Sequence, residues 1–74
     1  MYLNDVYKNK IYKIKKINTI DTIKQRFYDF GVVEGVKIKL LYISPSKTIK
    51  AYKINNSIIS IRDKYAKYIE VIDG

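Results

Sequence analysis

The segment IDTIKQRFYDFGVVEG, residues 20–35, decides the fold of this 74-residue chain. Its apolar side chains recur at steps of three and four residues, the spacing of one face of an α-helix: Ile20, Ile23, Phe27 and Phe30. Gly31 follows at once, and glycine readily ends a helix in the left-handed conformation. The segment therefore predicts one helix of about nine residues within 20–30, with its apolar face turned towards a core.

The polar residues of the same segment predict how the helix begins and what it exposes. Asp21 is placed to act as the N-cap, and Thr22 with Gln25 offers a competing capping-box frame. Lys24 and Tyr28 fall on the face that we expect to be exposed to solvent.

Residues 11–17, IYKIKKI, alternate as a half-buried β-strand does. Tyr12 and Ile14 share the apolar face, and lysines occupy the other. The alternation slips at Lys16, which fits a β-bulge or the end of the strand.

Alternation returns beyond the helix. Gly35 predicts a turn, and residues 36–43 then place four apolar side chains on one face: Val36, Ile38, Leu40 and Tyr42. Tyr12 and Tyr42 are therefore expected in the core or at its rim. Three further strands are expected over residues 48–54, residues 57–61 and the segment of Ile69, Val71 and Ile72.

Two short connections complete the pattern. Asn55-Asn56 predicts a tight hairpin turn, because asparagine tolerates positive φ. Asp63 is placed to cap a single helical turn that ends near Tyr68. We therefore predict a mostly β fold in one domain spanning residues 1–74: a small five-stranded SH3-like or OB-like barrel, with one helix between the first two strands and a helical turn before the last.

The composition argues against most catalytic and metal-binding functions. The chain has no cysteine and no histidine, so it lacks thiolate and imidazole metal ligands and any residue that would activate a serine nucleophile. The seven acidic residues form no local pair of the kind used in acid–base catalysis or calcium binding. We expect no catalytic residue, no metal site and no cofactor.

The formal net charge of +8 and the eight tyrosines suggest an alternative, a basic barrel that binds single-stranded nucleic acid. Lysine outnumbers arginine thirteen to two, however, and the abundant Lys, Ile, Asn and Tyr all have codons rich in adenine and thymine, so codon bias accounts for much of the charge. No apolar run approaches the roughly 20 residues of a membrane-spanning helix, and the N-terminus has no secretory signal pattern. A cytoplasmic location is expected.

Two motifs carry a resemblance to a known family. The segment from Arg26 to Gly35, RFYDFGVVEG, resembles the FeoA signature, in which a helix ending R-L-x-D-M-G is followed by L-x-P-G; Glu34 stands at the proline position. The later segment from Ser60 to Val71 is similar to the family's S-L-R-x-x-x-A-x-x-I-x-V. Asn9 and Asn56 stand where the family has glycines, and both residues can adopt a left-handed turn.

The resemblance implies an SH3-like barrel that acts beside FeoB, the membrane ferrous-iron transporter with a cytosolic GTPase domain, with the iron handled by that partner. For docking on such a partner the candidate residues are Lys24 and Tyr28, by their position on the predicted solvent face of the helix, and Arg26 and Arg62 from the two motifs. For both arginines a structural role is favoured over partner contact, for Arg26 an ion pair with a carboxylate such as Asp29 three residues later. An SH3-like groove for proline-rich peptides is a further alternative.

Overall fold

Five strands and three helical segments follow one another in the computed structural model, which describes residues 1–74. In chain order they are η1 (Leu3–Asp5), β1 (Ile11–Ile17), α1 (Asp21–Asp29), β2 (Lys37–Ile43), β3 (Ile49–Ile54), β4 (Ser57–Arg62), α2 (Asp63–Ala66) and β5 (Ile69–Asp73). The predicted strands and α1 are all present within one residue of their expected ends. The short helix α2 ends at Ala66, earlier than predicted, and the 3₁₀ helix η1 was not predicted.

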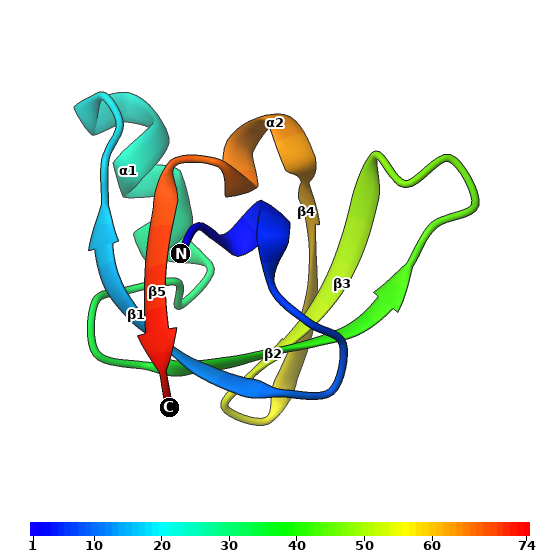
Figure 1. The fold of residues 1–74 in the computed structure, drawn as a ribbon. Helices are drawn as coiled ribbons and strands as arrows, with labels where there is room; N and C mark the ends of the chain where they lie inside the picture. Colours follow the sequence, from blue (N-terminus) through cyan, green and yellow to red (C-terminus); the bar gives the residue numbers. More distant parts are fainter.

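The strands form one antiparallel sheet in the order β4-β3-β2-β1-β5, which curls around the core (Figure 1). The helix α1 connects β1 to β2, and α2 precedes β5, so the mostly β class and the placement of both helices are confirmed. The register of β1 against β5 shifts between Ile14 and Lys16, which confirms a bulge close to the predicted slip.

One edge of the sheet is covered by the N-terminal segment and the other is open. The N-terminal segment covers β5, because Val71 N–H donates to Met1 O at 2.8 Å and Tyr2 forms an antiparallel bridge with Glu70. The strand β4 pairs only with β3. Its other side is therefore the open edge of the sheet.

The core is a single cluster of 15 buried apolar residues. They are Leu3, Val6, Tyr12, Ile14, Ile17, Phe27, Val32, Ile38, Leu40, Tyr52, Ile54, Ile61, Ala66, Ile69 and Val71. The Tyr52 hydroxyl donates to Leu3 O at 3.4 Å, and burial, followed by the nearby Asp63 carboxylate, raises the pKa of Tyr52 above its ordinary value. The Tyr12 hydroxyl accepts a hydrogen bond from Tyr7 N–H at 3.1 Å. Each buried phenol thus has a backbone partner, as burial of a polar group requires.

Helix α1 ends in a Schellman motif. Gly31 has φ +84°, its N–H donates to Tyr28 O at 2.9 Å, and Val32 N–H donates to Phe27 O at 2.9 Å. The left-handed glycine predicted from the sequence is confirmed, and so is the turn at Gly35, which has φ +92°.

The predicted N-caps are wrong. Ile20 occupies the N-cap position of α1 and Arg62 that of α2, and neither side chain makes a capping hydrogen bond. Asp21 and Asp63 are instead the first helical residues, where a negative charge interacts favourably with the helix dipole. Asp63 also forms an ion pair with Lys50.

Three apolar residues expected in the core are exposed instead. Ile20 and Phe30 are the cap residues on either side of α1, and they are 66% and 68% exposed, because only residues within the helix, such as Phe27, pack against the core. Tyr42 is 56% exposed, because the register of β2 against β3 shifts between Leu40 and Tyr42 and turns Tyr42 outwards. Tyr12 is buried, as predicted.

Positive φ falls on Asn9 (66°) and Asn55 (54°). Asn9 therefore adopts the conformation expected of it. The hairpin turn predicted at Asn55-Asn56 is present, and its left-handed residue is Asn55 rather than Asn56, which stands where the family has glycine.

Candidate functional site

An apolar groove lies between α1 and the open edge of β4. It has a volume of about 570 Å³. Eight of its 11 lining residues are hydrophobic: Ile23, Phe27, Phe30, Val32, Ile58, Ile59, Ile61 and Tyr65. The other three are Ser60 and the chain's only arginines, Arg26 and Arg62. We call this surface the α1/β4 groove.

The helix supplies one wall. Ile23 and Phe27 lie one turn apart and pack towards the core, Ile23 half-buried and Phe27 buried. The Schellman motif at Gly31 turns the chain sharply after the helix, so that Val32 returns to the core while Phe30 stays on the surface. Phe30 therefore lies exposed at one side of the groove.

The strand β4 supplies the other wall. Residues 58–62 all line the groove, and since neighbouring side chains of a strand point to opposite faces, a groove lined by consecutive residues must run along the strand's edge. Asp63 N–H donates to Thr48 O at 2.9 Å, so these two residues form a hydrogen-bonded pair of the β3–β4 ladder. In an antiparallel ladder, hydrogen-bonded pairs alternate with pairs whose backbone groups point away from the partner strand. The backbone N–H and C=O groups of Ile58, Ser60 and Arg62 therefore face away from β3. The edge beside the groove therefore offers unpaired N–H and C=O groups.

Both arginines at this groove are exposed, and neither forms an ion pair or a side-chain hydrogen bond. The alternative in which Arg26 pairs with Asp29 does not occur. Instead, Gln25 Nε2 donates to Asp29 Oδ1 at 3.0 Å. Two guanidinium groups thus remain free beside an apolar groove.

Lys24 and Tyr28, the other two predicted partner-binding residues, lie elsewhere on α1. The Tyr28 hydroxyl donates to Glu34 Oε1 at 3.0 Å, and Lys24 Nζ lies 3.8 Å from Glu34 Oε2. The pKa of Glu34 is held below its ordinary value, chiefly by a hydrogen bond from its own backbone N–H and further by Tyr28 and Lys24, against the opposing effect of burial. The structure thus divides the four predicted residues into a groove pair and a pair that binds Glu34.

Two main residues of the groove, Phe30 and Ile58, were not predicted as site residues. Each is 68% exposed. Phe30 was assigned to the buried helix face. The exposure of Ile58 could have been predicted in part, because Ile58 and Ile59 are adjacent and neighbouring side chains of a strand point to opposite faces. One of the two therefore cannot lie on the core face.

The chain contains no group of three or more His, Cys, Asp or Glu residues arranged to hold a metal ion. None of its helices is long and apolar enough to cross a membrane.

Comparison with known proteins gives consistent matches along the whole chain. The FeoA domain family matches residues 1–73. A Helicobacter pylori relative (strain ATCC 700392 / 26695) described as an Fe(2+) transport protein A is 38% identical over 72 residues, which is 96% of this chain and 95% of the relative.

Two solved structures show the same fold. Iron(II) transport protein A from Clostridium thermocellum is 25% identical with a TM-score of 0.91, and the match covers 96% of this chain but only 44% of that one. FeoA from Stenotrophomonas maltophilia, an SH3 domain protein solved in complex with zinc, is 17% identical with a TM-score of 0.83, covering 97% of this chain and 89% of that one. The SH3-like barrel predicted from the sequence is therefore confirmed.

Proposed function

The chain belongs to the FeoA family of non-enzymatic ferrous-iron transport accessory proteins, and on that basis we propose that it docks on the cytosolic part of the FeoB transporter and modulates iron transport or GTP hydrolysis there. In this proposal the transporter carries the iron, and the chain acts at the cytosolic face of the membrane.

The observation that carries the proposal is the α1/β4 groove. It combines apolar walls, two unpaired arginines and an open strand edge within one surface. Exposed apolar side chains beside free guanidinium groups are typical of protein interfaces, where aromatic residues and arginine are enriched.

The groove favours an extended segment of the partner. Such a segment would pair with the open edge of β4 through its backbone and place alternate apolar side chains against Phe30 and Ile58. Acidic side chains at its margins would meet Arg26 and Arg62, which suit bidentate contacts with carboxylates.

Lys24 and Tyr28 enter the proposal as secondary contacts. Glu34 already engages both side chains, so a partner gains less from them than from the unpaired arginines. Their replacement should weaken docking less than replacement of Arg26 or Arg62.

The test is a calorimetric titration of the chain with the purified cytosolic domain of FeoB near physiological salt. We expect measurable binding that Phe30→Asp weakens at least about tenfold, because the substitution places a charge in a buried apolar contact. Tyr7→Asp is the matched control, because Tyr7 is 69% exposed and lies outside the groove. Absence of binding, or equal weakening by the two substitutions, would overturn the proposal.

The tyrosines support the nucleic-acid alternative less in the structure than they did in the sequence. Tyr12 and Tyr52 are buried in the core, and Tyr28 is hydrogen-bonded to Glu34, so three of the eight tyrosines are not free to stack on bases.

A further inference from the structure

The outer face of the sheet carries four lysines in two directly opposed pairs. Lys13 on β1 is the register partner of Lys37 on β2, and Lys39 on β2 is the partner of Lys53 on β3. Directly opposed residues of antiparallel strands have close Cβ atoms, so like charges at such positions destabilise the sheet. These opposed lysine pairs therefore do not stabilise the fold.

None of these four lysines is neutralised. The four ion pairs of the structure use other lysines, namely Lys10, Lys15, Lys24 and Lys50. The same ion pairs engage four of the seven carboxylates, and the other three lie on η1 and α1: Asp5, Asp21 and Asp29. The four ammonium groups are therefore available to an external anion.

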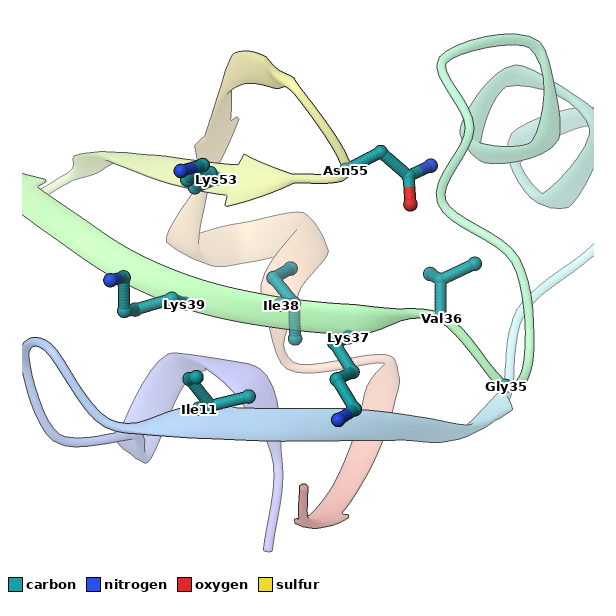
Figure 2. A pocket seen from close by; sticks show the side chains of 8 residues that line it. All are labelled: Ile11, Gly35, Val36, Lys37, Ile38, Lys39, Lys53 and Asn55. Carbon is teal, nitrogen blue, oxygen red and sulfur yellow. The ribbon is translucent and has the colours of Figure 1, made fainter.

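Three of these lysines surround a hollow, shown in Figure 2. Its volume is about 510 Å³, and Lys37, Lys39 and Lys53 line it together with Asn55 and Ile11. No acidic residue is among the lining residues. The charge around the hollow is thus entirely positive.

Exposed isoleucines flank the lysines in two rows across the sheet. One row is Ile72, Lys13 and Lys37, and the other is Ile11, Lys39, Lys53 and Ile58. The three isoleucines are 46%, 48% and 68% exposed in the order Ile72, Ile11 and Ile58. Lysine stems and isoleucines together give an apolar surface from which ammonium groups project.

A surface of this kind fits the boundary between phospholipid headgroups and acyl chains, where cationic side chains contact phosphates and apolar ones insert. A single nucleic-acid strand would instead require aromatic stacking side chains, and neither row contains an aromatic residue or an arginine. We propose that these two rows bind anionic phospholipid headgroups and lay the outer face of β1, β2 and β3 on a membrane surface. The proposal does not rest on docking to FeoB, because the rows share only Ile58 with the α1/β4 groove.

The test is co-sedimentation with vesicles of pure phosphatidylcholine and with vesicles that also contain phosphatidylglycerol. We expect binding only to the second kind, weakening as salt rises. Each lysine near an anionic surface contributes roughly fivefold to affinity, so Lys13→Gln with Lys37→Gln should lower it on the order of twentyfold, and so should Lys39→Gln with Lys53→Gln.

The matched control is Lys64→Gln with Lys67→Gln, two exposed positions in and just after α2 that remove the same net charge. We expect this variant to retain most of its affinity. No binding at low salt, or an equal loss in the control, would overturn the proposal. A single-stranded oligonucleotide held more tightly than the vesicles by the same four lysines would assign the face to nucleic acid instead.

Discussion

The hydroxyl of Tyr28 donates a hydrogen bond to Glu34 at 3.0 Å and so joins helix α1 to the turn that precedes β2. Glu34 stands where the family signature has proline, and Lys24 lies 3.8 Å from the same carboxylate. A side-chain link thus stiffens a turn that proline would stiffen by restricting φ.

We predict that Tyr28→Phe and Glu34→Gln are coupled. Each substitution alone should lower the free energy of unfolding by about 0.5–1 kcal/mol, less than is typical of buried charge-assisted bonds because the side chain of Glu34 is 38% exposed. The double variant should lose little more than Tyr28→Phe alone, since Glu34→Gln takes away the charge that strengthens the hydrogen bond and Tyr28→Phe removes the bond itself. Urea denaturation of the four proteins measures the coupling, and strictly additive losses would contradict it.

The same carboxylate predicts a pH dependence. The folded-state pKa of Glu34 lies below its unfolded value, so its stabilisation is complete above pH of about 4.3 and is lost as the pH falls through the folded pKa. The difference in unfolding free energy between wild type and Glu34→Gln should therefore shrink in acid. Thermal melts of both proteins from neutral pH down to pH of about 3 measure this difference. If the difference in unfolding free energy stayed constant over this pH range, the charge of Glu34 would not contribute to stability.

Gly31→Ala should lower the free energy of unfolding by about 1–2 kcal/mol. A methyl group at Gly31 would meet no atom within 4 Å, so the penalty comes only from its φ of +84°. Gly31→Asn should cost less, because asparagine tolerates the left-handed region better than alanine. Chemical denaturation distinguishes the variants, and equal stability of Asn and Ala at this position would argue against the backbone explanation.

Most of the fold could be predicted because the period of the apolar residues reports which backbone a segment adopts. The five strands, the helix α1 and the left-handed Gly31 all follow from local patterns. A slip in the alternation marked the bulge of β1 near Lys16, but Leu40 to Ile43 are all apolar and show no slip, so the bulge that turns Tyr42 outwards was missed. Residue type alone also does not separate Asn55 from Asn56 within one turn.

The groove was harder to predict because it depends on which elements become neighbours. Arg26 and Arg62 were singled out by motif, but nothing local shows that residues 36 positions apart line one groove or that β4 is an open edge. Phe30 was assigned to the core because the helix pattern includes it, whereas it is the C-cap, where the chain leaves the helix and the side chain stays on the surface.

Lys50→Met should lower the free energy of unfolding by about 1–2 kcal/mol. Lys50 Nζ donates to Asn4 O at 3.0 Å and lies 3.3 Å from Asp63 Oδ2, with only 10% of its side chain exposed. Methionine keeps the apolar stem but leaves both oxygens without their donor, and the partial exposure of Asp63 limits the loss. Lys8→Met, at an exposed lysine without an ion pair, is the control. Equal denaturation midpoints for the two variants would refute a stabilising role for Lys50.

Lys53→Glu should stabilise the protein by about 0.2–1 kcal/mol, because it replaces the like-charge partner of Lys39 with an opposite charge. Lys39→Glu should act in the same direction, whereas the double substitution restores a like-charge pair and should lose the gain. Urea denaturation at low and high salt checks the electrostatic origin, since screening must reduce the coupling between the two sites. If all four proteins were equally stable at low salt, the opposed lysines would impose no cost on the sheet. A measured cost would instead mean that the outer face carries its lysines for something other than folding.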